Sequence, residues 1–276
     1  MNKPVFSFEF FPPQTPEGVK NLAATREHLA PLKPEFFSVT FGAGGSTRDR
    51  TFETVQQIKM ENFAAAPHLS CVGSTRENIA AILNTYMNLG INRIVALRGD
   101  LPSGMGSIGE FQYANELVSF IRKETGDHFH IEVAAYPEFH PQAKSAHDDI
   151  LNFKRKIDAG ANSAITQYFY NPDAYFRFVE DSRKLGVTVP IVPGIMPIVK
   201  YSQLARFSDM CGAEIPRWMR KKLEGFGDDS EAVQSFGLEV ITQLCEKLLV
   251  GGAPGLHFYT LNKSAPVLAI WKRLGL

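Results

Sequence analysis

Polar side chains stand at the ends of several short apolar segments of this 276-residue chain. A buried position normally excludes charge unless the charge is paired, so these residues are candidates for chemistry. Carboxylate, amide, imidazole and guanidinium groups gathered at one edge of a sheet can bind a ligand and move protons. The residues at these ends are Glu9, Thr40, His68, Arg98, Asp100, Tyr136, Glu138, His140, Gln167, Tyr259 and Asn262.

Glu9 lies among Phe6, Phe8, Phe10 and Phe11. Removal of water from a carboxyl group disfavours its charged form, so we expect a raised pKa for Glu9. A raised pKa would suit donation of a proton near neutral pH. The sequence is equally consistent with a structural carboxylate that pairs with a neighbouring Arg or Lys.

Arg98, Gly99 and Asp100 end the fourth apolar segment. The glycine would let a ligand approach the backbone, and the guanidinium could clamp a phosphate. The carboxylate could accept two hydrogen bonds from an amidine-like edge. The alternative is that Arg98 and Asp100 form an ion pair with each other and bind no ligand. Gln167 suits an amide or pterin edge, or else it bonds to a neighbouring strand.

Two glycine-rich segments and one charged helical face could bind phosphate. Residues 41–46 (FGAGGS) offer consecutive N–H groups, although an ordinary turn has the same composition. Residues 104–109 (GMGSIG) match GxGxxG, but they do not follow the preceding strand directly, so we interpret them as a loop. Asp149, Asn152 and Lys156 would share one helical face that binds ribose and phosphate, unless that face is simply solvated.

Eight apolar segments, rich in β-branched and aromatic residues, would position these groups. They cover residues 5–11, 36–43, 64–72, 93–100, 130–138, 163–170, 190–197 and 256–262. The first seven begin 27 to 37 residues apart, the size of a strand–helix unit. Amphipathic segments alternate with them at residues 18–29, 76–89, 113–124, 143–159 and 173–185. We therefore expect one α/β domain over residues 1–276, a (β/α)8 TIM barrel with extra helices before the eighth strand. An open doubly wound sheet is the alternative.

Composition narrows the class of protein. Lys and Arg number 29 and Asp and Glu number 29, a balance that argues against nucleic acid or membrane as a partner. Cys71, Cys211 and Cys245 are far apart, and an odd count favours a reducing cytoplasm. The His and Cys spacing matches no metal-site pattern. The 21 Phe residues point to core packing or to a pocket for flat ligands.

The same segment ends carry a family resemblance that runs along the whole chain. Residues 7–13 (SFEFFPP), 96–100 (ALRGD), 134–138 (AAYPE), 165–167 (ITQ) and 257–262 (HFYTLN) occur in the family's order. The chain thus resembles the methylenetetrahydrofolate reductases of the short bacterial form. The resemblance implies a barrel with non-covalent FAD, reduction of the flavin by NADH, and transfer of the hydride to 5,10-methylenetetrahydrofolate in a ping-pong reaction. It also implies 5-methyltetrahydrofolate for methionine synthesis and a homo-oligomer.

The resemblance assigns roles to individual residues. Glu9 matches the proton donor, Asp100 the carboxylate at the pterin edge, and Gln167 a contact of both folate and nicotinamide. Phe207 matches an aromatic that lies against either substrate, and Gln203 a second folate contact. Folate binding also extends to Tyr259 and Lys263. The positions that match the cofactor site are Thr40, Phe41, Ala43, His68, Arg98, Gly99, Asp100, Ala114, Tyr136, His140, Ala143, Asp149, Asn152, Arg155 and Lys156.

This chain departs from the family pattern at two positions. Lys263 stands where Arg is frequent, which keeps the charge but loses the bidentate fork. Phe41 stands where an aromatic hydroxyl can occur. We expect no S-adenosylmethionine-binding second domain. Two other functions remain open: a barrel lyase or aldolase acting on a phosphorylated substrate, and a non-catalytic flavin- or folate-binding protein.

Overall fold

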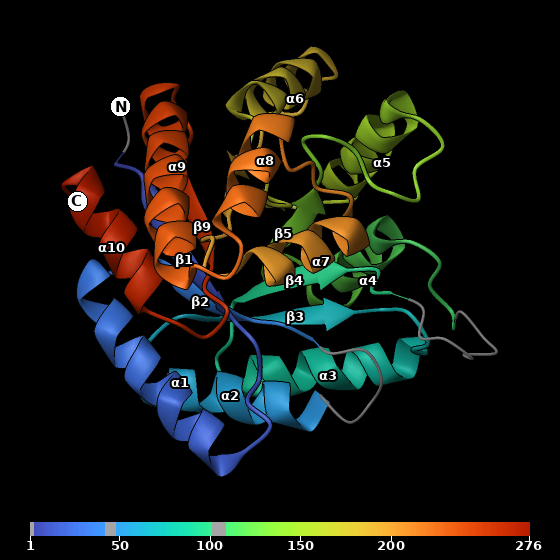
Figure 1. The fold of residues 1–276 in the computed structure, drawn as a ribbon. Helices are drawn as coiled ribbons and strands as arrows, with labels where there is room; N and C mark the ends of the chain where they lie inside the picture. The colour runs from blue at the N-terminus through green and yellow to red at the C-terminus, as the bar shows by residue number, and fades with distance from the viewer. Residues whose placement is uncertain (1–2, 42–47, 101–108) are drawn as a thin grey trace.

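The protein is described by a computed structural model that covers residues 3–41, 48–100 and 109–276. Nine parallel strands form one sheet in the order β7-β6-β5-β4-β3-β2-β1-β9-β8, surrounded by helices (Figure 1). The strands are β1 (Val5–Phe10), β2 (Phe36–Val39), β3 (Ala65–Ser70), β4 (Arg93–Leu97), β5 (His130–Ala135), β6 (Ser163–Thr166), β7 (Ile191–Val192), β8 (Gly194–Ile195) and β9 (Gly255–Tyr259). The predicted TIM-barrel class is therefore confirmed.

The nine strands occupy the eight positions of the expected barrel because the predicted seventh strand is split at Pro193. Val192 on β7 pairs with β6, whereas Gly194 on β8 pairs with His257 on β9. Proline has no N–H group for the ladder, but its carbonyl accepts a hydrogen bond from the His257 N–H at 3.0 Å. A Cβ on Gly194 would lie 2.1 Å from the Thr166 carbonyl oxygen, so only glycine fits where the sheet closes.

Helices alternate with the strands, as the spacing predicts. They are α1 (Pro16–Leu29), α2 (Arg48–Met60), α3 (Arg76–Asn88), α4 (Ala114–Thr125), α5 (Ala146–Asp158), α6 (Pro172–Lys184) and α10 (Ala265–Leu274), with a short 3-10 turn, η1 (Ala30–Leu32). Several predicted boundaries are displaced, and among the helix starts the largest error is at α5, which begins at Ala146 and not at Ala143. The Ser145 hydroxyl accepts a hydrogen bond from the Asp148 N–H and so caps α5 at that point.

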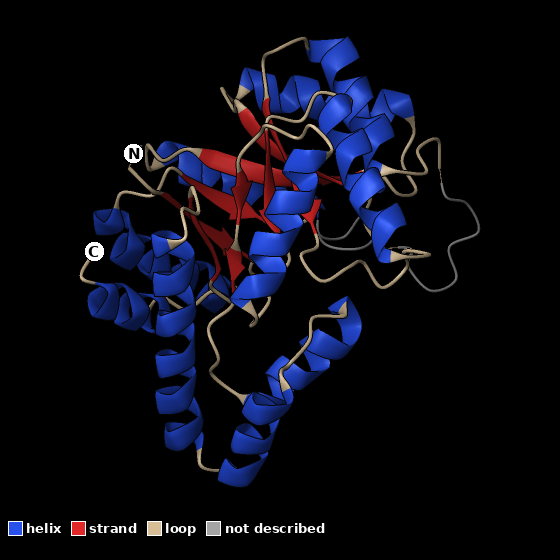
Figure 2. Cartoon of the chain, turned by 90° about the horizontal axis from the view of Figure 1, so that it is seen from above, coloured by secondary structure: helices blue, strands red, loops and turns tan. Residues whose placement is uncertain are grey.

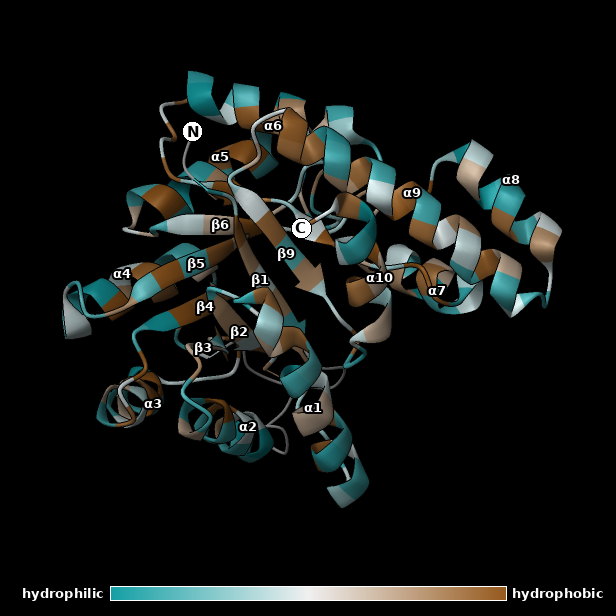
Figure 3. Cartoon of the chain, turned by 90° about the vertical axis from the view of Figure 1, so that its left-hand side faces the viewer, coloured by the Kyte–Doolittle hydropathy of each residue, from teal (hydrophilic) through white to brown (hydrophobic). Residues whose placement is uncertain are grey.

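Three extra helices precede β9, as expected from the long gap: α7 (Tyr201–Cys211), α8 (Arg217–Phe226) and α9 (Ser230–Val250). They gather with α10 on one side of the barrel (Figure 3), and seen from above they extend well beyond the strands (Figure 2). Two contacts fasten this extension to the strand ends. The Tyr168 hydroxyl lies 3.1 Å from Ser208 Oγ, and Glu138 accepts a hydrogen bond from the Glu214 N–H at 2.7 Å.

The core interleaves aromatic rings from neighbouring strands. Phe8 is fully buried between Phe37 and Phe258, with ring centroids 6.1 and 5.8 Å away. Burial of one such side chain contributes about 1.5–3 kcal/mol. Cys71 and Cys245 are also fully buried, so both serve as small core residues. Most of the phenylalanines thus serve packing.

A second polar cluster lies at the amino-terminal end of the strands. Buried Glu132 on β5 accepts hydrogen bonds from Arg93 and from Ser163, and His130 Nε2 lies 3.3 Å from its Oε1. Arg93 also bonds to Glu35. Burial opposes the charge of Glu132, but these partners outweigh burial and lower its pKa. Because active sites of such barrels lie at the opposite end, this cluster serves stability. None of the helices in the described ranges is both long and apolar enough to span a membrane.

Candidate active site

The carboxyl ends of the parallel strands bring the predicted side chains to one end of the barrel. Glu9 is on β1, His68 on β3 and Tyr259 on β9, while Arg98 and Tyr136 directly follow β4 and β5. Since all strands run in one direction, their carboxyl ends share one rim. Residues from nearly the full length of the chain therefore meet there.

Glu9 is held between two histidines. Its Oε2 atom lies 3.2 Å from His68 Nε2 and 3.5 Å from His257 Nε2. The Glu9 side chain is 11% exposed, that of His68 10%, and that of His257 is not exposed at all. Behind His257, the Ser7 hydroxyl lies 2.7 Å from Nδ1. Glu9 thus pairs with histidine, and not with Arg or Lys as the structural alternative supposed.

This arrangement corrects the expected pKa of Glu9. Burial is the largest single influence and raises the pKa, as the surrounding phenylalanines suggested. However, the positive charges and N–H groups of His68 and His257 together outweigh burial and lower the pKa to about 2. Glu9 is therefore ionised at neutral pH. Any proton that it donates must reach it from a neighbour or from solvent.

Tyr259 reaches across the rim from β9. Its hydroxyl donates a hydrogen bond to the Thr166 carbonyl oxygen at 2.7 Å, and its ring meets the His257 ring edge-on at a centroid distance of 5.3 Å. Burial, followed by the nearby Glu9 carboxylate, raises the Tyr259 pKa well above its ordinary value. Tyr259 therefore stays neutral and fixes the wall beside Glu9.

The segment after β4 positions a guanidinium group. The Arg98 guanidinium donates to Gln142 Oε1 at 2.6 Å and to the Gly99 carbonyl oxygen at 3.2 Å, and Asp100 is exposed. No Arg98–Asp100 ion pair occurs among the described residues. Gly99 has a φ of 85°, and a Cβ there would lie 1.9 Å from Ser70 Oγ. Glycine is thus required by packing against Ser70, whatever its role toward a ligand.

A second group of polar side chains joins the end of β5 to α5. The Asp149 carboxylate accepts a hydrogen bond from the His140 N–H at 2.9 Å, and the His140 ring meets Tyr136 at 4.6 Å. The Lys156 ammonium donates to the Ala134 carbonyl oxygen at 2.5 Å. Burial lowers the Lys156 pKa to about 8, against the opposing charge of Asp149. This part of the predicted helical face therefore points toward the strand ends.

The remaining predicted positions are less closely connected. Arg155 and Asn152 are exposed and hydrogen-bond to each other. The half-buried positions outside the strands are Thr40 and Phe41 after β2, Ala114 at the start of α4, Ala143 before α5, and Gln203 and Phe207 on α7. Lys263 is exposed after β9. Ala43, and residues 42–46 and 104–108 of the two glycine-rich segments, lie outside the described residues.

Helix α7 lies next to Gln167. A small cleft is lined by Tyr136, Gln167, Tyr168 and Cys211. The Gln167 Oε1 atom accepts a hydrogen bond from the Tyr168 N–H at 3.0 Å, so its amide is oriented by its own chain neighbour. The Arg206 guanidinium lies over the Phe207 ring, 5.3 Å from the centroid. The structure thus brings β5, β6 and α7 together around one cleft.

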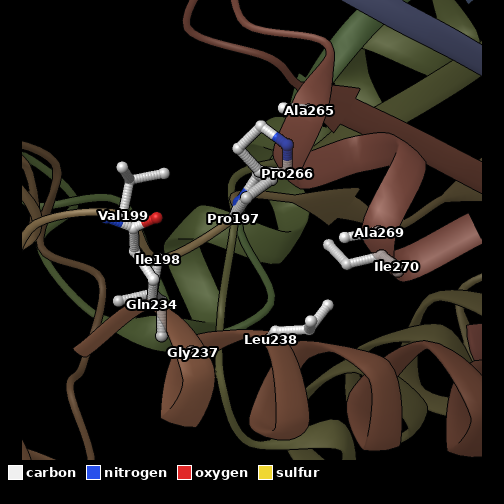
Figure 4. A pocket seen from close by; sticks show the side chains of 10 residues that line it. All are labelled: Pro197, Ile198, Val199, Gln234, Gly237, Leu238, Ala265, Pro266, Ala269 and Ile270. Carbon is white, nitrogen blue, oxygen red and sulfur yellow. The ribbon is translucent and has the colours of Figure 1, made fainter. Parts of the chain in front are cut away.

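A separate apolar cavity of about 170 Å³ lies between the segment after β8, α9 and α10 (Figure 4). Its lining carries no titratable side chain; it consists of Pro197, Ile198, Val199, Gln234, Gly237, Leu238, Ala265, Pro266, Ala269 and Ile270. The cavity therefore offers no group for acid–base chemistry. Within the described part of the chain, no three His, Cys, Asp or Glu side chains could hold a metal ion.

The sequence analysis missed Ser7 and His257. Both signals were present: Ser7 precedes Glu9 by two positions, as His257 precedes Tyr259, so each pair points to one face of its strand. A polar residue at each of these positions in otherwise apolar strands marks an inward-facing polar patch. What the sequence lacked was the register that places Ser7 opposite His257.

These features define a (β/α)8-barrel enzyme whose polar residues meet at the carboxyl ends of the strands. The family model described as "Methylenetetrahydrofolate reductase" matches residues 1–275. The chain is 45% identical over 270 residues to the 5,10-methylenetetrahydrofolate reductase of Escherichia coli, covering 98% of this chain and 90% of the relative. The chain therefore belongs to the methylenetetrahydrofolate reductase family.

Two further comparisons extend this result. A methylenetetrahydrofolate reductase (NADH) of Arabidopsis thaliana is 40% identical over 287 residues, with 98% of this chain covering 48% of that relative. A solved protein of Clostridium thermocellum, described as binding two copies of 5-methyl-5,6,7,8-tetrahydrofolic acid, has a TM-score of 0.70 at 18% identity. The structural match covers 97% of this chain and 92% of the Clostridium thermocellum chain. That likeness supports the fold alone.

Proposed function

We propose that this enzyme reduces 5,10-methylenetetrahydrofolate to 5-methyltetrahydrofolate with NADH as the electron donor and non-covalent FAD as the cofactor. Family membership supports the folate reaction, and the name of the plant relative supports NADH. The observation that carries the proposal is Glu9, a carboxylate held between two histidines at the carboxyl end of a barrel strand. A proton-relaying group at that rim is what opening of the folate ring requires.

The side chains near β4, β5 and α5 suit FAD. Arg98 and the desolvated ammonium of Lys156 would face the pyrophosphate or the electron-rich pyrimidine, and Asp149 would face hydroxyl groups. His68, whose Nε2 atom already lies 3.2 Å from Glu9 Oε2, would line this site beside the flavin. FAD would carry the two electrons of NADH to the folate as a hydride. We further propose that Tyr136, His140, Asn152 and Arg155 contribute to this site.

The protein must open the five-membered ring of the folate before reduction. Protonation of N10 breaks the bond to the bridging carbon and leaves an iminium cation at N5. Glu9 would deliver the proton, and the Asp100 carboxylate would stabilise the cation and bind the pterin edge. Gln167, Gln203 and Phe207 would orient the ring system from β6 and α7, and Lys263 would meet the anionic tail.

A barrel lyase is less well supported by the structure. A Schiff-base mechanism needs a lysine that is free to attack the substrate. None of the nine described strands carries a lysine, and Lys156 on α5, which does reach the rim, is bonded to the Ala134 carbonyl oxygen. A non-catalytic flavin-binding protein remains the second alternative. On the resemblance, we also propose a homo-oligomer, which size-exclusion chromatography with light scattering would test. The three free cysteines support a location in the cytoplasm.

One anaerobic experiment tests the proposed reaction. The purified protein is loaded with FAD, and its flavin absorbance is followed after addition of NADH and then of 5,10-methylenetetrahydrofolate. We expect bleaching by NADH and recovery of colour with the folate. A protein that stays colourless with added FAD would overturn the proposal. Bleaching without recovery would exclude folate reduction, and absence of bleaching would favour the non-catalytic alternative. Repetition with NADPH defines the donor.

A further inference from the structure

Behind Glu9, strand β9 contributes a histidine with no other evident function. His257 is fully buried, and its Nδ1 atom lies 2.7 Å from the hydroxyl of Ser7, which is also buried. Its Nε2 atom lies 3.5 Å from Glu9 Oε2, and the described residues offer it no other acceptor. A buried polar nitrogen needs a partner, and the partner available to this one is a carboxylate.

The His257 ring is fixed in its orientation. Phe36 stacks against it with centroids 6.1 Å apart, and Tyr259 meets it edge-on at 5.3 Å. The strand register pairs Ser7 directly with His257 and Glu9 with Tyr259, so β1 and β9 hold all four residues rigidly. When Ser7 accepts the Nδ1 proton, the Nε2 atom can only face Glu9. Ser7 therefore sets both the orientation of the imidazole and the nitrogen that is available for transfer.

We propose that His257, oriented by Ser7, is a positioning residue that supplies a proton to Glu9 through Oε2 and thereby makes the ionised carboxylate of Glu9 an acid for the folate. This inference rests on the proposed function and adds to it the source of the proton. His68 touches the same oxygen at 3.2 Å. However, His68 also lies at a position assigned to the cofactor, whereas His257 contacts only the protein.

The transfer balances in protons. The doubly protonated His257 gives its Nε2 proton to Glu9 Oε2 and becomes neutral, while its other proton stays on Nδ1 in the hydrogen bond to Ser7. Glu9 then gives the proton to N10 of the folate and returns to the carboxylate. Before the next folate binds, a proton from solvent enters at the partly exposed Glu9 and passes to His257, which holds it in reserve until the folate covers the site. No electrons move in this sequence.

The titratable groups that face this cluster are few. Glu9 is met by His68 from β3 and by His257 and Tyr259 from β9, and β2 contributes only apolar residues and Ser38. Since the reaction needs a proton on this cluster, the folate half-reaction of the wild type should slow as the pH rises.

The test compares the two half-reactions in variants of His257 and Ser7. His257→Gln keeps an N–H donor near Glu9 but cannot give up a proton. We expect its folate half-reaction, measured by anaerobic stopped flow, to slow by about 100-fold. The pH above which this half-reaction slows should also be lower than in the wild type. Ser7→Ala should slow the same step by about tenfold, and Ser7→Thr, which keeps the hydroxyl, should restore it. Flavin reduction by NADH, which needs no proton from Glu9, is the internal control.

A matched control exists at the other end of the barrel. Ser163 Oγ lies 2.7 Å from His130 Nε2, a serine–histidine pair of the same length that is remote from the rim. Ser163→Ala should leave the pH profile of the folate half-reaction unchanged. If His257→Gln keeps both the rate and the pH profile of the wild type, the inference is wrong.

Failure of the inference can be distinguished from failure of the proposed function. If Glu9→Gln abolishes the folate half-reaction but His257→Gln does not slow it, only the proton source is wrong. If Glu9→Gln retains the half-reaction, the donor assignment itself fails, and the inference with it. Should His257→Gln not fold, histidine ¹⁵N spectra of the wild-type holoenzyme provide the second measurement. A His257 that stays neutral throughout the active pH range would overturn the proposal.

Discussion

If Glu9 is ionised and held by two histidines, its charge stabilises the folded protein. Its apolar surroundings alone would predict the opposite, namely that a buried charge destabilises it. We expect Glu9→Gln to lower the free energy of unfolding at pH 7, because the amide cannot replace a carboxylate held by two histidines. The pKa of Glu9 is lowered from 4.5 to about 2. Each pKa unit between these values is worth about 1.4 kcal/mol, so the loss has an upper bound of about 3.5 kcal/mol.

The pH dependence of this loss has a definite sign. A carboxyl group with a lowered pKa stabilises the folded state fully above its unfolded pKa of 4.5, and the stabilisation disappears as the pH falls toward 2. The difference between wild type and Glu9→Gln should therefore be constant from pH 7 to pH 5 and shrink below that range. Urea denaturation of the flavin-free protein, followed by circular dichroism, measures it.

An exposed pair supplies the control for this experiment. Glu224 forms a surface pair with Lys221 at 2.7 Å, so Glu224→Gln makes the same chemical change with little effect on stability. If Glu9→Gln is as stable as the wild type at pH 7, or more stable, then Glu9 is protonated in the folded protein. The pairing with His68 and His257 would then not determine its charge.

Three further predictions concern other parts of the fold. Glu132→Gln should destabilise the protein by about 1–3 kcal/mol in urea titrations at pH 7, because it weakens the hydrogen bonds that Arg93 and Ser163 make to a buried carboxylate, while Arg93 keeps its bond to Glu35. The effect should shrink below the ordinary carboxyl pKa of 4.5. Gly99→Ala should lower the melting temperature more than Gly186→Ala does. The two glycines have similar φ angles of 85° and 82°, but only at Gly99 would the added carbon meet a neighbour, Ser70 Oγ at 1.9 Å. Equal melting temperatures would contradict this prediction. The Lys156 pKa is about 8, so its charge is lost above that pH. FAD affinity, measured by fluorescence, should therefore fall about tenfold from pH 7 to pH 9. Lys156→Arg should remove this pH dependence, because arginine stays charged.

The barrel and most of its strand ends could be predicted because they depend on local patterns. Apolar runs at regular spacing specify parallel strands that are buried on both faces, and polar residues at their ends stand out. The division of the seventh strand at Pro193 depends on which neighbour each half meets, β6 or β9, and no local pattern encodes that choice. The start of α5 was missed by three residues because Ser145 was not interpreted as a cap.

The charge of Glu9 could not be predicted from the sequence for a different reason. The phenylalanines that raise its pKa are adjacent in the chain, whereas the histidines that lower it come from other strands. Ser7 and His257 are separated by 250 positions, and only the pairing of β1 with β9 joins them. Sequence alone therefore revealed the desolvation and not its compensation. Family resemblance identified the residue but not its protonation state.

The pairing of β1 with β9 also has a consequence for synthesis of the chain. Glu9 on β1 leaves the ribosome before the residues of the other strands, and its partner His257 emerges only after eight strands and α9 have been made. Until β9 inserts between β1 and β8, the first strand has an unpaired edge and carries a carboxylate with only part of its counter-charge. The nascent chain thus cannot bring His257 to Glu9 before the barrel closes. If the proposed proton transfer holds, catalytic competence and closure of the barrel are one event, completed by β9.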